Sequence, residues 1–206
     1  MDWAKWDEHY KKIGINSGRI CRDGIFDDKE WERTKRKVLF ILKEVNDWEG
    51  GNLKDLFENG PKYQMWHTIC RWAAGIQNGF PNFEEINNWD VLSTTIKSLA
   101  SINLKKTSGG ASANMSVVNA YAVVNQALLQ EQITLIAPDI VIACGTFESV
   151  IWLMNLRVDP DNPYTKTIFS DDYHCWVVPW RHPGRVNNEK TYYELKKIIE
   201  PVGLYK

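Results

Sequence analysis

A carboxylate follows one of the most apolar runs in the sequence. Glu44 comes two residues after the run 38–42, and Asn46 and Trp48 follow it closely. A carboxylate at the end of a strand, beside apolar walls, is held in place and partly desolvated, which are properties of a general base. A helix cap or a solvated surface acid is the alternative interpretation of Glu44 taken alone.

A carboxamide stands near the end of the next apolar run. Asn103 falls within the run 99–104, and Lys105 and Lys106 follow it, before a glycine- and serine-rich turn that begins at Ser108. An amide offers a hydrogen-bond donor and an acceptor on one edge, which suits the edge of a nucleobase. The turn with its two lysines suits a phosphate, and a flexible surface loop is the alternative.

A histidine between two arginines follows a fourth apolar run, 175–178. His182 lies in a proline-rich loop with Arg181 and Arg185, a compact cationic group that suits a phosphate or a developing anion. A single histidine is most often structural. Because polar groups follow three runs that we predict to be strands of one sheet, the sequence favours a common functional site.

Strands of one sheet must position these groups. The apolar runs that we predict to be strands alternate with helical patterns; they are 38–42, 99–104, 140–144 and 175–178. The predicted helices are 61–76, 83–96, 116–136, one capped by Thr146, and a last one capped by Asn188 that runs to 199. The expected fold is α/β, a three-layer α/β/α sandwich with a central, mainly parallel four-stranded sheet. Ligands of such sheets bind beyond the carboxyl ends of the strands.

The composition is typical of one globular domain. Of 206 residues, 44% are hydrophobic and 25% are charged, so we expect a single domain over 1–206, with 1–24 as an N-terminal helical arm or lid. The net charge of −1 argues against bulk attraction to nucleic acid or membrane but permits a local basic face. Without an apolar run of about 18 residues or a signal-peptide pattern, we expect a cytoplasmic protein with no membrane partner, and a monomer.

The cysteines and the common motifs give no sign of a metal or cofactor site. Cys21, Cys70, Cys144 and Cys175 lie far apart and form no CxxC pair, so buried free thiols are favoured over a metal site. The sequence lacks the GxGxxG, P-loop, GxSxG and HExxH patterns. We therefore expect no cofactor and no metal.

The order of the three polar motifs resembles the uracil-DNA glycosylase superfamily. Members of that family have a strand followed by a water-activating motif, a later strand that ends in a base-reading asparagine, and a late histidine loop that grips DNA. The chain carries LKEVN at 42–46, NLKKT at 103–107 and HPGR at 182–185. The resemblance spans 38–186.

The resemblance implies a DNA glycosylase that hydrolyses the glycosidic bond of a flipped pyrimidine and leaves an abasic site. It places Glu44 on the water-polarising acid, Asn103 on the base reader and His182 on the group that stabilises the departing base. Arg185 and Val186 fall in the loop that enters the duplex. The other expected base-binding side chains are Asn46, Trp48 and Trp66, and the other expected DNA contacts are Lys105, Lys106, Ser108 and Arg181.

The chain departs from the strict uracil enzymes in its first motif. Those enzymes carry an aromatic residue that bars bulk at pyrimidine C5, where this chain has Val45 and Asn46. We expect a pocket that admits C5-modified pyrimidines, as in divergent bacterial members that strip modified bases from phage DNA, so the role is antiviral or repair. Two alternatives stay open: a catalytically silent nucleic-acid or nucleotide-binding domain of the same fold, and an enzyme acting on free nucleosides.

Overall fold

Four parallel strands form the centre of the main sheet, and they are the four that the sequence predicts. The structure, a computed structural model, describes residues 1–159, 161 and 167–203. The strands found there are β1 Cys21–Arg22, β2 Gly24–Ile25, β3 Val38–Leu42, β4 Val45–Asn46, β5 Gly51–Asn52, β6 Leu99–Asn103, β7 Ser108–Gly109, β8 Ile140–Cys144, β9 Ile168–Ser170 and β10 Cys175–Trp180. The fold class is α/β, as expected.

The prediction of a four-stranded sheet is wrong. Among the described residues the main sheet has six strands in the order β2-β6-β3-β8-β10-β9, and the two edge strands, β2 and β9, run antiparallel to their neighbours. The sheet is therefore mixed. The edge strands have only two and three residues, which is too short to produce a recognisable apolar run.

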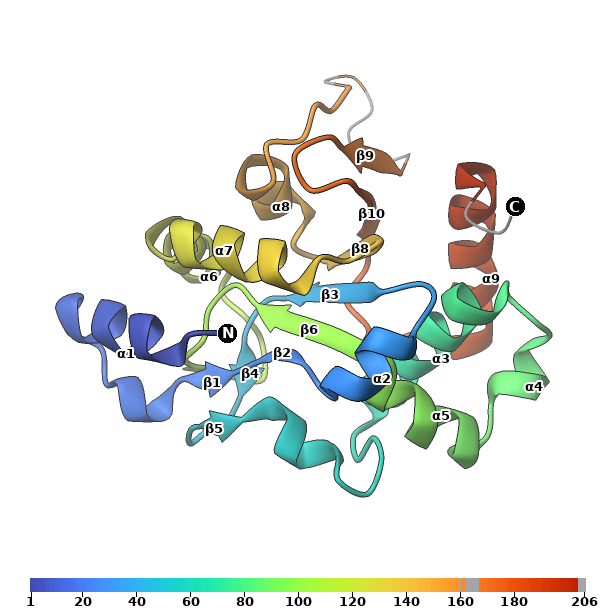
Figure 1. Cartoon of the computed structure of the whole chain (residues 1–206), viewed down its shortest axis with the longest axis horizontal. Coiled ribbons are helices and arrows are strands. Elements are labelled where there is room, and N and C mark those ends of the chain that lie inside the picture. Colours follow the sequence, from blue (N-terminus) through green and yellow to red (C-terminus); the bar gives the residue numbers. More distant parts are fainter. Residues whose placement is uncertain (160, 162–166, 204–206) are drawn as a thin grey trace.

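Helices lie on both sides of this sheet (Figure 1). The described α-helices are α1 Trp3–Lys12, α2 Asp28–Arg33, α3 Gln64–Asn78, α4 Phe83–Ile86, α5 Trp89–Thr95, α6 Met115–Val124, α7 Gln126–Ile136, α8 Phe147–Leu153 and α9 Asn188–Ile199. Short 3₁₀ helices cover Ser17–Arg19, Leu53–Phe57, Ile96–Ser98 and Glu200–Val202. None of the described helices is long and apolar enough to cross a membrane.

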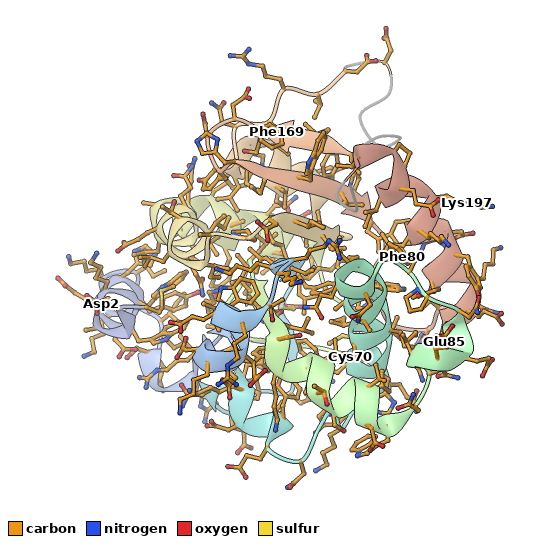
Figure 2. All side chains as sticks on the ribbon, turned by 45° about the vertical axis from the view of Figure 1, so that its right-hand side comes forward. Asp2, Cys70, Phe80, Glu85, Phe169 and Lys197 are labelled. Atoms are coloured by element: carbon orange, nitrogen blue, oxygen red, sulfur yellow. The ribbon has the colours of Figure 1, made fainter. Side chains whose placement is uncertain are left out.

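Alternate side chains of β3 divide the core into two clusters. Phe40 packs on one face with side chains of α3 and α9, whereas Leu39 and Ile41 pack on the other face with side chains of α1, α6, α7 and α8. Figure 2 shows side chains filling the space between the sheet and the helices on each face. Cys70 of α3 belongs to one of the two clusters, and Phe169 lies on the edge strand β9. Burial on both faces explains why β3 reads as a continuous apolar run rather than an alternating one.

Two predicted helices are divided in the structure. The helix expected at 116–136 is interrupted at Asn125, whose buried amide donates to Tyr10 Oη at 3.0 Å and to the main-chain oxygen of Leu104 at 3.2 Å. The helix expected at 83–96 is divided into α4 and α5, and Asn88 caps the second part by accepting from the Val91 amide. Both breaks come from asparagines whose side chains bind groups outside their own helix or cap its start.

The predicted starts of three helices need correction or refinement. The helix α3 begins at Gln64 rather than at Pro61. Asn187, not Asn188, caps α9, because its side chain accepts from the Lys190 amide at 3.0 Å. Thr146 precedes α8 as expected, but its hydroxyl donates to the main-chain oxygen of Ile41 at 2.9 Å instead of capping the helix.

The N-terminal segment packs on the sheet. Within α1, Trp6 and Tyr10 are fully buried in the cluster that covers one face. The chain then runs through β1 to Asp23, which is buried between β1 and β2 beside the end of β6. The segment expected to be an arm or lid therefore supplies a buried carboxylate to the interior.

Candidate functional site

A cavity of about 800 Å³ lies at the carboxyl ends of β3 and β6. Six side chains that the sequence analysis selects line it together: Glu44, Asn46, Trp48, Trp66, Asn103 and His182. The volume falls within the range of roughly 300 to 1000 Å³ that is usual for small-molecule sites. Residues from three separate motifs thus share one pocket, at the edge of the sheet where parallel α/β folds bind ligands.

The Glu44 carboxylate is held by a buried ion pair. Its Oε2 accepts from Nζ of Lys105, and the two side chains are only 7% and 9% exposed. The same ammonium group donates to the main-chain oxygen of Ser108 at 2.6 Å. Gly109 lies against the carboxylate so closely that a Cβ there would overlap it. Glu44 is therefore held in position from two sides.

A short parallel pairing joins the first and second motifs. The strands β4 and β7 pair Val45 with Ser108 and Asn46 with Gly109. The Ser108 hydroxyl oxygen also accepts from the Trp48 amide at 2.8 Å. The start of the glycine- and serine-rich turn thus holds Glu44 and Trp48 in place, and contact with the Glu44 carboxylate accounts for the glycine at 109.

Asn103 is fully buried, and its side-chain oxygen has no hydrogen-bond partner among the described residues. Its main-chain N–H and its Nδ2 both donate to Oδ2 of Asp23, at 2.7 and 3.1 Å. Its Oδ1 has no hydrogen-bond partner in the part of the chain that the structure describes. A buried acceptor without a partner is costly in a native protein, so this atom is a candidate ligand contact.

Lys106, which the sequence predicts to contact DNA, is buried in the structure. Its side chain is 0% exposed and donates to Asp23 Oδ1 at 2.6 Å and to Gln132 Oε1 at 2.8 Å. Its ammonium nitrogen lies 4.9 Å from the centre of the Trp6 ring. Burial lowers the pKa of Lys106, and the Asp23 carboxylate opposes that effect. Lys105, also predicted to bind DNA, faces Glu44 instead.

His182 lies at the cavity with one ring nitrogen already bound. Its Nδ1 accepts from the Gly184 amide at 3.1 Å, so in the neutral ring the proton is on Nε2, which is left as a donor. Desolvation of the ring by the surrounding atoms lowers the pKa of His182, although the residue is exposed, and the nearby Lys43 charge adds to that effect. Lys43 also lines the cavity, and the sequence analysis assigns it no role.

The rest of the histidine loop divides into exposed and packed residues. Arg181 is exposed, pairs with Glu194 at 2.8 Å and lies over the Trp180 ring. Arg185 is exposed with φ of +60°. Val186, predicted to enter the duplex, is partly buried against the cluster under α3 and α9. Arg185 is therefore the more accessible of the two residues.

Aromatic rings form much of the cavity wall. Trp66 is buried and packs edge-to-face on Phe57, with ring centres 4.8 Å apart. Trp48 is half-buried, and its Nε1 has no partner among the described residues. Tyr63 also lines the cavity and is 52% exposed. Tyr63 is not among the residues predicted from the sequence, although its place just before the apolar stripe of α3 is a usable signal.

The cysteines are all free and buried, which confirms the expectation drawn from their spacing. Burial raises the pKa of the Cys175 thiol to about 12, so this sulfur is a core group rather than a nucleophile at neutral pH. Within residues 1–159, 161 and 167–203, no group of three or more histidine, cysteine, aspartate or glutamate side chains is arranged to hold a metal ion.

Comparison with known proteins assigns the chain to no family. No protein-family model matches the sequence. No curated protein matches it significantly. The functional conclusion therefore rests on the cavity and its side chains.

Proposed function

We propose that the protein is a DNA glycosylase that hydrolyses the N-glycosidic bond of a flipped pyrimidine and leaves an abasic site. The observation that carries this proposal is that the Glu44 carboxylate and the Asn103 amide, from neighbouring strand ends, line one cavity. The helices on both faces of the sheet and the order of the three motifs support a relationship to the uracil-DNA glycosylase superfamily.

The cavity has the groups that each step of this reaction needs. Extrusion of a base costs a few kcal/mol, and stacking on an aromatic ring returns about 1 to 3 kcal/mol per base. Trp48 and Tyr63 are the accessible rings for this stack. As the bond from C1′ to the base breaks, its electron pair moves onto the base, and the sugar gains positive charge that the Glu44 anion stabilises.

Water completes the reaction. Its oxygen bonds to C1′ while Glu44 orients it and receives its proton. The His182 Nε2–H donates a hydrogen bond to the oxygen of the departing base, where negative charge develops. Glu44 then releases its proton to solvent and the base anion takes one up, so the products are the neutral free base and an abasic sugar. The protein groups that act in this scheme are side chains of the cavity.

The cavity wall supports a C5-modified pyrimidine as the substrate class. Val45 lines the cavity where the strict uracil enzymes carry a bulkier aromatic residue. The volume of about 800 Å³ leaves room beyond a bare pyrimidine ring. Modified pyrimidines of this kind occur in phage DNA and in oxidised cellular DNA, so the proposed role is antiviral defence or repair.

An excision assay tests the proposal. Duplexes with uracil, 5-hydroxymethyluracil or modified cytosines, and native phage DNA, are incubated with the protein and then treated with alkali, which cleaves abasic sites. We expect strand breaks on at least one substrate, and at least a hundredfold slower excision by Glu44→Gln with DNA binding retained. Strand breaks on none of the substrates would sink the proposal.

The Glu44→Gln variant needs a matched control because Glu44 forms an ion pair with Lys105. Glu44→Gln leaves the buried Lys105 ammonium without its counterion, which destabilises a protein independently of catalysis. The double variant Glu44→Gln/Lys105→Met removes both charges. A glycosylase predicts that both variants are inactive, whereas an activity loss caused by misfolding predicts recovery in the double variant.

The same ion pair is the observation that favours a second candidate, a catalytically silent domain that binds nucleic acid or a nucleotide. A carboxylate paired with an ammonium group serves a structural role as well as a chemical one. This candidate predicts tight binding of a modified nucleotide without any excision, in the wild type and in Glu44→Gln alike.

A further inference from the structure

The orientation of the Asn103 side-chain amide is constrained by its neighbours. Asn103 Oδ1 is a buried acceptor without a partner among the described residues, whereas an Nδ2 hydrogen of the same amide is already bound by Asp23. An asparagine amide has an acceptor end and a donor end of nearly equal size, so the hydrogen-bond network around it decides which end faces a ligand. Here the two ends have different surroundings.

Asp23 is itself fixed by a buried network. Its Oδ1 accepts from Lys106 at 2.6 Å and from Gln132 Nε2 at 3.0 Å, and its side chain is 0% exposed. An ionised carboxylate only accepts hydrogen bonds, so the amide oxygen of Asn103 cannot take the place of its nitrogen there. Turning the amide over would set the Asn103 oxygen against Oδ2 of Asp23 in a buried site. Oδ2 would keep the main-chain N–H of Asn103 but lose the bond from Nδ2, and the Asn103 oxygen would find no donor there.

We propose that Asp23 is a positioning residue that determines specificity by fixing the Asn103 amide with Oδ1 towards the cavity. The site then takes pyrimidines that carry an N–H donor on the edge facing Asn103. This proposal rests on the proposed function and deepens it. The ring N3–H of a 4-oxo pyrimidine and the 4-amino group of a cytosine both supply such a donor, whereas a methylated nitrogen supplies none and leaves Oδ1 unpaired.

The N-terminal helix α1 also contacts the network of Asp23, Lys106 and Gln132. The Trp6 ring lies over the Lys106 ammonium, and the Tyr10 hydroxyl lies 3.4 Å from the Lys106 amide as its hydrogen-bond acceptor. Both aromatic residues belong to α1, so this helix covers the network, and none of its residues lines the cavity. Asp23 also reaches Asn103 from a part of the chain that precedes all three motifs.

Binding of paired probes tests the proposal without requiring excision. Single-stranded oligonucleotides carry one deoxyuridine, N3-methyldeoxyuridine, deoxycytidine or N4,N4-dimethyldeoxycytidine, and their dissociation constants are measured by fluorescence anisotropy. We expect wild-type protein to prefer the N–H form over its methylated partner by at least tenfold in one pair or both. Asp23→Asn/Lys106→Met, which removes both buried charges, should reduce that preference to about threefold or less.

A control variant separates positioning from general loss of stability. Thr191→Val removes a buried hydrogen bond, the one donated by Trp72 Nε1 at 3.2 Å, away from the Asp23 network. It should keep the wild-type preference. Absence of discrimination in the wild type, failure of all four probes to bind, or full discrimination in the double variant would each overturn the proposal.

A second measurement applies if the double variant does not fold. In wild-type protein, the side-chain NH₂ of Asn103 should give NMR signals whose hydrogens exchange with water much more slowly than those of an exposed asparagine. Exchange at the free rate would overturn the fixed amide. If the wild type prefers the N–H probes but excises no base, the glycosylase proposal fails and this inference stands. If the wild type excises a base and the double variant keeps the full preference, the glycosylase proposal stands and this inference fails.

Discussion

Gly109 is the residue on which the position of the Glu44 carboxylate most depends. A Cβ at this position would overlap the carboxylate, whereas a Cβ at Gly110 meets no atom within 4 Å. Because Gly109 does not have a left-handed φ, alanine strains the carboxylate and not the backbone. We expect Gly109→Ala to slow excision at least tenfold and to shift the melting temperature by only a few degrees. Gly110→Ala, measured in the same assay, should match the wild type.

Equal activity of Gly109→Ala and Gly110→Ala would mean that the carboxylate moves without consequence. In that case Glu44 does not act from a fixed position, and its role is the structural pairing with Lys105. The comparison therefore tests the geometry of the site with a change that adds one methyl group and no charge.

The pKa of His182 is sensitive to the positive charge of Lys43 beside it. Partial desolvation and the Lys43 charge both lower the pKa of His182 below its ordinary value of 6.5, because each disfavours the protonated ring. We expect an NMR midpoint below 6.5 in the wild type and a higher midpoint in Lys43→Met, where a repelling positive charge is removed. Lys5→Met, which changes a lysine paired with Glu131, should leave the midpoint unchanged. A midpoint that stays or falls in Lys43→Met contradicts the prediction.

The sequence locates the reacting side chains better than the side chains that hold them. Glu44 and Asn103 follow strands that can be recognised by their apolar runs, so their convergence at one sheet edge is predictable. Asp23 is 80 residues from Asn103, and only the fold brings them together. Lys105 and Lys106 resemble a basic pair on a surface loop, but both are directed inwards to carboxylates.

At the scale of elements, burial on both faces makes a strand easy to predict. The strands β3, β6 and β8 are buried along their whole length and β10 along most of it, whereas the edge strands are too short to carry a pattern. The interruption at Asn125 is hidden from the sequence for a different reason. Its cause is a hydrogen bond to Tyr10, a residue 115 positions away in α1.

The contact between α1 and the end of β6 predicts a stability effect. The Tyr10 hydroxyl lies within hydrogen-bonding distance of the Asn125 amide group and of the Lys106 amide, and it is buried. Tyr10→Phe leaves these donors without their acceptor, so we expect the free energy of unfolding to fall by about 1 to 3 kcal/mol. Urea denaturation followed by circular dichroism measures it. Tyr63→Phe, on a ring that is 52% exposed, should change stability by less than about 0.5 kcal/mol.

An unchanged midpoint for Tyr10→Phe would show that water replaces the hydroxyl and that α1 is only loosely attached. The expected loss would instead make α1 an integral part of the layer that covers Lys106. The two outcomes distinguish a removable lid from a structural helix. The composition of residues 1–24 does not make this distinction.

At the scale of the whole molecule, the near-neutral charge has a different meaning once Lys105 and Lys106 are counted as internal. They neutralise Glu44 and Asp23 and add nothing to an external basic face. The tryptophans are divided in the same way: Trp72 and Trp6 fill the core, and Trp48 borders the cavity. Affinity for DNA, on the proposed function, should therefore depend more on base stacking than on phosphate contacts.

The salt dependence of binding measures that balance. Lys43 lines the cavity, Lys62 precedes the lining residue Tyr63 in the chain, and Arg185 belongs to the loop of His182. None of these three cations has an ion pair within the described residues, whereas Arg181 pairs with Glu194. Each phosphate contact contributes a slope of about −0.9 to log K against log salt, so three contacts predict a slope of about −3. Anisotropy titrations of duplex DNA between 50 and about 200 mM salt give this value.

Two variants show whether the slope comes from the mouth of the cavity. Arg185→Gln should make the slope shallower by about 1, because one phosphate contact is lost. Lys12→Gln changes an exposed lysine of α1 that pairs with Glu8 and should leave the slope unchanged. A wild-type slope of about −6 or steeper, or an equal effect of both variants, would mean that DNA lies across a wider basic surface than the one beside Glu44 and His182. A slope near −3 that responds only to Arg185 would tie phosphate binding to the same cavity that holds the base.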